Sequence, residues 1–278
     1  MGKIDIEILK KTVSEYSLTT NIQNELLERL KKSVIDNGNL ITDANKEDVK
    51  ISKKQVKIKK ILEIIDFYKT KKFKDNKRKT KIVIYKGDPY LTLNICLQAL
   101  ISKTKVILLC DDFMIGVNKV LIKIILNVFG KYRIDNLINF NTNYTLEDID
   151  KLEKICDDIV VIGDTLIYQQ LKDNKKKIKF YSYNNIVLYC DSNELLKLQE
   201  AIYIYANENQ FELEIVYLKS IDEVLERVKN NKLINTVVLL TKSNTHKELF
   251  ESSLKDKDVY VNDNPFKQEV GRIYNFFE

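Results

Sequence analysis

The amino-acid sequence predicts an α/β protein of three layers, in which N-terminal helices precede a mainly parallel sheet and a reduced second α/β lobe follows. Between residues 81 and 262, short β-branched runs alternate with helical segments, as in βαβ units. Most of these runs are apolar throughout, which is typical of strands covered on both faces. The 278 residues, 44% hydrophobic and 31% charged, can bury a sizeable core without disulfides.

The N-terminal region, residues 1–80, shows helical patterning. Polar breaks near Thr19–Asn21 and Asn37–Asn39 divide residues 5–49 into two or three amphipathic helices. A further helix is expected within residues 56–73, since apolar side chains recur there at spacings of three and four: Ile58, Ile61, Leu62, Ile65 and Tyr68. Residues 72–81, KFKDNKRKTK, are expected to form an exposed linker.

The next part, residues 81–205, is expected to form the parallel sheet. Strands are predicted at 81–87, 105–110, 136–140, 158–164, 178–182 and 185–191, with helices at 91–102, 118–129, 146–156, 165–173 and 193–207. The strands at 81–87 and 105–110 must be parallel, because a helix of a dozen residues joins them.

The smaller lobe, residues 206–262, is expected to contain strands at 213–218, 235–241 and 258–263 and helices at 221–231 and 246–254. The tail, residues 263–278, ends in RIYNFFE. Because this ending is too apolar for a free terminus, we expect the tail to pack on another subunit, giving a homo-oligomer, or on its own lobe.

Composition excludes several classes of site. With 7 Gly and 2 Pro, the chain has no candidate for a GxGxxG or GxxxxGK[ST] phosphate loop. A single histidine, His246, disfavours serine-hydrolase triads and zinc sites, which place an imidazole beside other specific groups. No metal is therefore expected.

The four cysteines lie in or beside apolar runs: Cys96, Cys110, Cys156 and Cys190. We expect them to be reduced and buried, which indicates a cytoplasmic protein. The N-terminus has no apolar signal region, and no run of 18 apolar residues occurs, so membrane insertion is not expected.

Positive charge is concentrated in one segment. Between Lys50 and Lys81 the charge is +11, which leaves −5 for the rest of the chain. Such a segment could contact phosphates in a nucleic acid or an anionic surface. A solvated helix face explains the lysines better, since no aromatic-interleaved RNA motif or recognition helix accompanies them.

Read in order, several segments resemble one superfamily. They are ITDANKEDV (41–49), residues 87–126 from GDPYLTLN onward, CDDIVVIGDTLIYQQL (156–171), NNIVLYCDSNELLKLQEAI (184–202) and the closing section 220–266, with its Val-Tyr-Val-Asn strand. Together they resemble the aldehyde dehydrogenases, and among them gamma-glutamyl phosphate reductases most closely. The resemblance implies an aldehyde dehydrogenase-like fold with a Rossmann-like cofactor domain in 81–205 and a catalytic-domain remnant in 206–262.

The same resemblance implies that the catalytic groups are missing. In the superfamily a cysteine thiolate attacks the substrate carbonyl beside a nicotinamide cofactor. Gln210 occupies the position of that cysteine, and Lys179 occupies the position of the general base. A large insertion of the family is also absent, since the chain passes from Leu218 to Ile221 with almost nothing between.

On the cofactor side, Leu109 stands where the family has a cofactor-contacting Lys or Arg. Gly163 is the plausible survivor of a glycine beside the nicotinamide, although a strand-to-helix turn also explains it. It is followed by Asp164, whose carboxylate would repel a pyrophosphate. NAD or NADP is implied by the resemblance alone, and these three positions weaken that implication.

These observations favour a catalytically inactive aldehyde dehydrogenase-like protein that serves in binding or assembly, with a protein partner that the sequence does not identify. One alternative is an NAD(P)-dependent aldehyde or acyl-phosphate oxidoreductase with a non-standard active site. The other is a basic protein that binds nucleic acid or an anionic surface.

Overall fold

The structure, a computed structural model, describes residues 20–52, 55–71, 79–163, 165–172, 178–181, 186–208, 213–216, 220–231, 234, 236–255 and 257–263. These residues fall into two compact units, one within Met1–Lys179 and the other within Phe180–Glu269. In the described part of the chain, no helix is long and apolar enough to cross a membrane.

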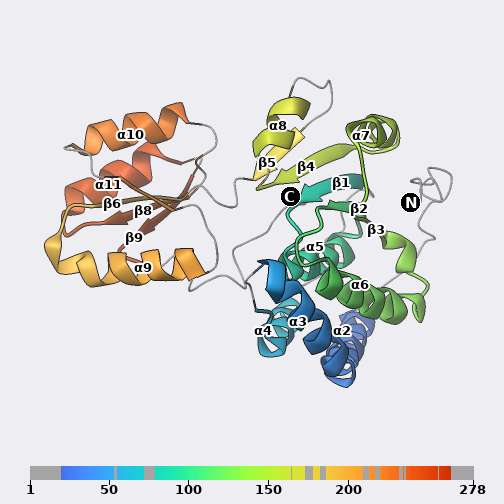
Figure 1. Cartoon of the computed structure of the whole chain (residues 1–278). Helices are drawn as coiled ribbons and strands as arrows, with labels where there is room; N and C mark the ends of the chain where they lie inside the picture. The colour runs from blue at the N-terminus through green and yellow to red at the C-terminus, as the bar shows by residue number, and fades with distance from the viewer. Residues whose placement is uncertain are drawn as a thin grey trace. The chain divides into compact units, whose positions relative to one another are not determined.

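The first unit is built on a five-stranded sheet with the order β3-β2-β1-β4-β5 (Figure 1). Its strands are β1 (Thr80–Tyr85), β2 (Lys105–Cys110), β3 (Ile138–Asn141), β4 (Asp158–Ile162) and β5 (Ile178–Tyr181). Strands β1 to β4 are parallel, with Ile82 of β1 beside Ile107 of β2 and Ile159 of β4. The predicted parallel pairing of the first two strands is therefore confirmed.

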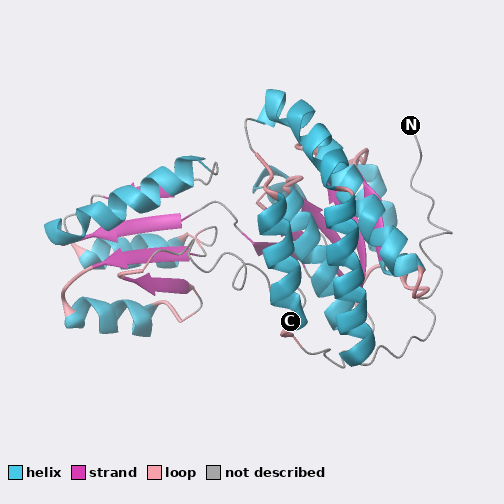
Figure 2. Cartoon of the chain, turned by 90° about the horizontal axis from the view of Figure 1, so that it is seen from below, coloured by secondary structure: helices cyan, strands magenta, loops and turns pink. Residues whose placement is uncertain are grey.

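Helices cover both faces of this sheet. On one face lie α5 (Pro89–Ser102) and α6 (Ile115–Gly130), with α2 (Thr20–Asp36), α3 (Gly38–Ser52) and α4 (Ile58–Lys69) packed outside them (Figures 1 and 2). On the other face lie α7 (Leu146–Glu153) and α8 (Thr165–Leu171). All residues of α5 are buried, because this helix is enclosed between the sheet and the outer helices.

The second unit contains a four-stranded parallel sheet with the order β7-β6-β8-β9. Its strands are β6 (Ile186–Cys190), β7 (Leu213–Val216), β8 (Thr236–Leu240) and β9 (Asp258–Val261). Val187 and Tyr189 pack toward α10 (Ile221–Asn230) and α11 (Asn244–Ser253), whereas Ile186 and Leu188 pack toward α9 (Leu196–Glu208). Helices on both faces explain why the strands are apolar throughout.

The observed units divide the chain differently from the expected domains, because the regions expected at 1–80 and from residue 81 share the first unit, which ends within the domain expected at 81–205. Strand β6, expected in the domain 81–205, pairs with β7 and β8 and so belongs to the second sheet. The sequence could not show this, because a doubly covered parallel strand has the same apolar pattern in either sheet. The linker at 72–78 and the tail from residue 264 lie outside the described residues.

The N-terminal prediction is confirmed for the helices within residues 20–52 and 58–69, whereas its part at residues 5–19 lies outside the described residues. Helices α2 and α3 begin at Thr20 and Gly38, at the two polar breaks. In α4, Ile61, Ile65 and Tyr68 are buried as expected, and the unforeseen Ile64 is buried as well. Because α4 packs against both α2 and α5, its buried surface is wider than a single stripe.

Candidate functional site

The carboxyl edge of the first sheet is the place where a parallel α/β fold binds ligands. The strand order reverses between β1 and β4, and ligands bind in the crevice outside the strand ends at such a switch point. The turns that follow β1, β2 and β4 meet at this edge. Gly87 follows β1, and Gly163, with a positive φ of 76°, follows β4.

The turn after β1 is held by carboxylates. Asp88 caps α5, since its Oδ1 accepts hydrogen bonds from the backbone amides of Tyr90 (2.8 Å) and Leu91 (3.3 Å). The amide of Gly87 donates to Oδ1 of Asp111, 2.8 Å away in the turn after β2. A Cβ on residue 87 would lie 2.3 Å from the carbonyl oxygen of Phe113, so the two turns meet where only glycine fits.

The turn after β2 is closed in the same way. Asp111 Oδ1 also accepts from the amide of Phe113 at 3.0 Å. The N-cap residue of α6, Met114, has a left-handed backbone and provides no side-chain cap. The cap comes from α3, where the carboxylate of Asp48 accepts from the amides of Gly116 (3.2 Å) and Val117 (2.8 Å).

A buried polar network joins the two turns. The Asn118 side chain donates to the carbonyl oxygen of Gly87 (2.5 Å) and accepts from Thr92 Oγ1 (2.5 Å), which contacts the Tyr85 hydroxyl at 2.8 Å. Burial raises the pKa of Tyr85 well above its usual value, so the phenol stays neutral. The network holds both turns in place, and the raised pKa of Tyr85 makes it unsuited to exchange protons near neutral pH.

The electrostatic character of the edge follows from these contacts. Three carboxylates, those of Asp48, Asp88 and Asp111, accept six backbone amides that face the ends of β1 and β2. Asp112 adds an exposed carboxylate, and the ammonium of Lys86 lies 4.9 Å from the centre of the Phe113 ring. A diphosphate at the N-termini of α5 and α6 would have to displace the carboxylates of Asp88 and Asp48.

The site residues suggested by the resemblance do not come together. Leu109 lies within β2 rather than after it, between Ile84 and Asn141, and its side chain is fully buried. Lys179 lies in β5 and is half-buried. The pKa of Lys81 is lowered mainly by burial, and the positive charge of Lys179 lowers it further. Asp164 and Gln210 lie outside the described residues. Of these residues, Gly163 is the one in the described part of the chain that lies at the switch point, directly after β4.

Sequence reasoning missed the role of Asp48, although the resemblance includes it in an Ala-Asn-x-x-Asp motif. The motif, residues 44–48, lies inside α3, which continues to Ser52. Its Asn45 side chain accepts a hydrogen bond from the amide of Val56 at 3.1 Å. The motif thus fixes α3 to the segment before α4 and to the start of α6.

The second unit has a polar cluster at the switch point of its own sheet, between β6 and β8. Asp191, directly after β6, contacts Nδ1 of His246 at 2.5 Å and accepts from Thr241 Oγ1 at 2.8 Å. Asn262, after β9, bonds to both the amide and the carbonyl of Thr241. These contacts tie the ends of β6, β8 and β9 to α11. No group of three metal-ligating side chains occurs among the described residues.

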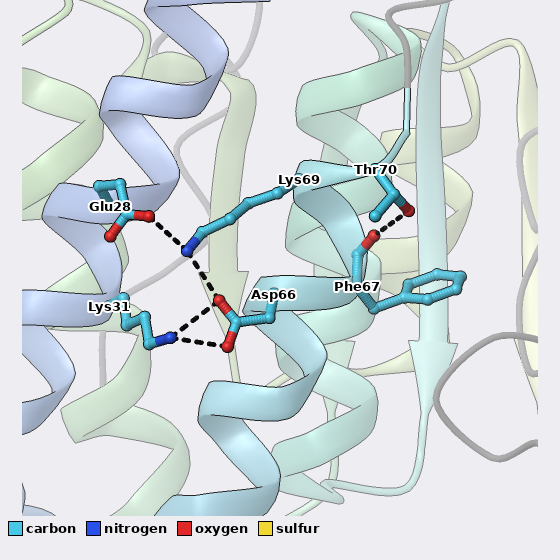
Figure 3. A network of polar contacts seen from close by, with 6 residues as sticks. All are labelled: Glu28, Lys31, Asp66, Phe67, Lys69 and Thr70. Atoms are coloured by element: carbon cyan, nitrogen blue, oxygen red, sulfur yellow. Dashed lines mark hydrogen bonds and ion pairs between the residues drawn. The ribbon is translucent and has the colours of Figure 1, made fainter.

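Several described lysines of the basic segment pair with carboxylates within the fold. Lys69 contacts Glu28 and Asp66, and Lys31 of α2 contacts both oxygens of Asp66, as Figure 3 shows. Lys50 pairs with Glu47, and Lys59 with Glu63. The pairs of Lys31 with Asp66 and of Lys69 with Glu28 join α2 to α4, whereas the pairs of Lys50 and Lys59 each lie within one helix. A lysine that is paired with a carboxylate is less available to a phosphate.

No protein-family model matches the sequence, and a comparison with curated proteins finds no significant match. Solved structures do resemble the chain. A gamma-glutamyl phosphate reductase from Thermotoga maritima matches with a TM-score of 0.59 and 13% identity, over 93% of this chain and 85% of that one. A propionaldehyde dehydrogenase from a Clostridium phytofermentans bacterial microcompartment matches with a TM-score of 0.60 and 10% identity, over 94% and 86%.

An engineered glycolyl-CoA reductase with bound NADP+ is also similar, with a TM-score of 0.57 and 8% identity, over 90% of this chain and 84% of that one. At these identities the likeness establishes the architecture and not the chemistry. It agrees with the parallel sheets and N-terminal helices described above. The chain therefore has an aldehyde dehydrogenase-like fold.

Proposed function

We propose that this chain is a catalytically inactive aldehyde dehydrogenase-like protein whose role is binding or assembly. The observation that carries the proposal is the carboxyl edge of the first sheet. There, six backbone amides are already bonded to Asp48, Asp88 and Asp111. An NADP+ molecule, which the engineered reductase of similar fold binds, would meet carboxylates where its phosphates need donors.

The thiols support the same proposal. In the aldehyde dehydrogenases that the sequence resembles, covalent chemistry on the aldehyde uses a reactive thiolate. Burial raises the pKa of Cys96 and, together with nearby Asp111, raises the pKa of Cys110 to about 12. Cys156 is also buried, and Cys190 lies at the end of β6 with its sulfur against the carbonyl of Ser192. None of these positions combines exposure with an adjacent cation that would activate a nucleophile.

The experiment is a pair of measurements on the purified full-length chain. Calorimetric titration with NAD+ and NADP+ measures binding, and nicotinamide absorbance with a panel of aldehydes and acyl phosphates measures turnover. An active aldehyde dehydrogenase serves as the positive control. We expect neither tight binding nor turnover. Turnover would refute the proposal, and tight binding without turnover would change the role from assembly protein to nucleotide sensor.

A further inference from the structure

The carboxyl edge of the second sheet differs in chemistry from that of the first. Helix α9, which follows β6, and helix α11, which follows β8, cover opposite faces, so the edge between these two strands is a switch point where such sheets bind ligands. At the first sheet, carboxylates accept backbone amides at this place. At the second sheet, the carboxylate of Asp191 contacts the imidazole of His246, on the first turn of α11.

The contact with Asp191 decides which nitrogen of this imidazole carries a proton. Nδ1 of His246 lies 2.5 Å from Oδ2 of Asp191. Because an ionised carboxylate only accepts hydrogen bonds, Nδ1 is the donor, and Nε2 of the neutral imidazole then holds the lone pair. Nε2 is therefore the atom that can accept a proton or attack an electrophile.

The ends of three strands hold the carboxylate in place. Thr241, directly after β8, donates from Oγ1 to Oδ2 of Asp191 at 2.8 Å. The side chain of Asn262, after β9, accepts from the amide of Thr241 at 2.8 Å and donates to its carbonyl oxygen at 2.6 Å. The amide of Asp191 donates to the carbonyl oxygen of Leu240 at 3.1 Å. An imidazole oriented in this way from a rigid sheet edge is positioned before any ligand arrives.

The imidazole is also open to solvent. The His246 side chain is 33% exposed, whereas that of Asp191 is 17% exposed. Within the part of the chain that the structure describes, Nδ1 is the ring nitrogen that is hydrogen-bonded. The ammonium of Lys242, four positions earlier, pairs with Glu194.

We propose that His246 is the nucleophilic residue of a second site, which takes an acyl group from an activated ester, and that Asp191 is its positioning residue. Nε2 attacks the carbonyl carbon, a C–N bond forms, and the C–O bond to the leaving alkoxide breaks. The acyl-imidazolium keeps its Nδ1 proton beside the carboxylate. Water then adds its hydroxyl to the acyl group, the C–N electron pair returns to Nε2, and the remaining proton goes to the alkoxide.

This inference goes beyond the proposed function, which concerns dehydrogenase chemistry. It rests on the second unit alone and needs neither a nicotinamide nor a thiolate. The two proposals can therefore fail separately. Nicotinamide turnover would refute the first one, whereas the second is decided by ester hydrolysis without any nicotinamide.

Hydrolysis of p-nitrophenyl acetate by the full-length protein at pH 8 tests the site, with release of p-nitrophenolate as the readout. We expect the rate per histidine to exceed that of N-acetylhistidine about tenfold, the usual effect of a carboxylate that orients an imidazole. His246→Gln should reduce the rate to that of buffer. The matched control is Lys247→Gln, an exposed neighbour on α11, which should keep the wild-type rate. Cys190→Ser should also keep it, which distinguishes the imidazole from the half-buried thiol.

The positioning role of Asp191 has its own readout, because His246 is the only histidine of the chain. Long-range ¹H–¹⁵N correlation spectra of the labelled protein at pH 8 report its tautomer. We expect the Nδ1–H form in the wild type, and its loss in Asp191→Ala together with a fall of the ester rate to that of N-acetylhistidine. Circular dichroism verifies the fold of each variant. An Nε2–H tautomer in the wild type, or an unchanged ester rate in His246→Gln, overturns the proposal.

Discussion

Asp48 Oδ2 accepts a hydrogen bond of 2.8 Å from the backbone amide of Val117, although 69 positions separate the two residues in the chain. The contact joins α3 to the first turn of α6, where the local sequence provides no side-chain cap. It therefore couples the outer helical layer to the helix that follows β2. A carboxylate is favourable here because the N-terminus of a helix carries partial positive charge.

Replacing Asp48 by alanine should reduce the free energy of unfolding by about 0.5–2 kcal/mol, the usual effect of losing a helix cap. Urea denaturation measures the change. Asp43→Ala is the control on the same helix, since its pair with Lys46 is exposed and should contribute less than about 0.5 kcal/mol. Equal effects of the two substitutions would show that the hydrogen bonds of Asp48 to α6 contribute no more to stability than an exposed ion pair does.

Gly87→Ala should destabilise the protein by about 1–3 kcal/mol, because the added Cβ would lie 2.3 Å from the Phe113 carbonyl oxygen and force the two turns apart. The matched substitution is Gly130→Ala at the end of α6, where a Cβ would meet no atom within 4 Å. That variant should be neutral or up to about 1 kcal/mol more stable. Thermal unfolding of the pair checks both signs, and a stable Gly87→Ala protein would contradict the close approach.

Asp66 should make the first unit sensitive to acid. Hydrogen bonds from Lys31 and then Lys69 hold the pKa of this carboxyl below its ordinary value of 3.8 (Figure 3). A lowered pKa means that the stabilisation is complete above pH 3.8 and is lost as the pH falls through the folded-state pKa. Urea denaturation from pH 7 to pH 3 should show a smaller loss for Asp66→Asn than for the wild type.

Because the Asp66 side chain is 45% exposed, salt should weaken its contribution as well. Asp43→Asn, at an exposed carboxyl, should follow the wild-type pH profile. If Asp66→Asn also follows that profile, the network contributes nothing in solution.

The sequence predicts the elements of the first unit well because its signals are local. A helix of a dozen residues between two apolar runs requires a parallel pair, and β1 and β2 form it. The helix predicted at 91–102 is also found, although it begins two residues earlier, at Pro89, where the Asp88 side chain caps it. In such a strand-to-helix turn, the residues that end the strand and start the helix are neighbours in the sequence.

Relationships between distant segments could not be predicted in the same way. The allocation of β6 to the second sheet depends on hydrogen bonds to β7 and β8, which no periodicity shows. The hydrogen bonds at the carboxyl edge also join distant residues, since Asp48 accepts from the amide of Val117 and Asp111 accepts from the amide of Gly87.

The cysteines should differ in reactivity toward iodoacetamide at pH 8. With its pKa raised to about 12 by burial, Cys110 has a thiolate fraction of about one in ten thousand, and buried Cys96 is protected for the same reason. Half-buried Cys190 should be alkylated first, as peptide mass spectrometry can show. The other thiols should react only after unfolding in urea. Rapid alkylation of Cys110 in the native protein would contradict its buried position.

Gln210→Cys should not create a dehydrogenase. The substitution supplies a sulfur atom at the position that the resemblance assigns to the nucleophile, which lies outside the described residues. A thiolate also needs a lowered pKa, a stabiliser for the developing oxyanion and a positioned cofactor. At the carboxyl edge of the first sheet, carboxylates hold the helix N-termini, and Leu109 is buried where a cation would be needed.

Catalytic groups that act as a unit are strongly non-additive, so restoring one of them returns little rate while the others are missing. Initial rates of nicotinamide absorbance change with aldehydes and acyl phosphates should be indistinguishable for the wild type, Gln210→Cys and the control Gln210→Ser. Alkylation of the introduced thiol shows separately whether the new cysteine is accessible. Turnover by Gln210→Cys, lost again in Gln210→Ser, would show that the cofactor site is intact and that only the nucleophile has been replaced.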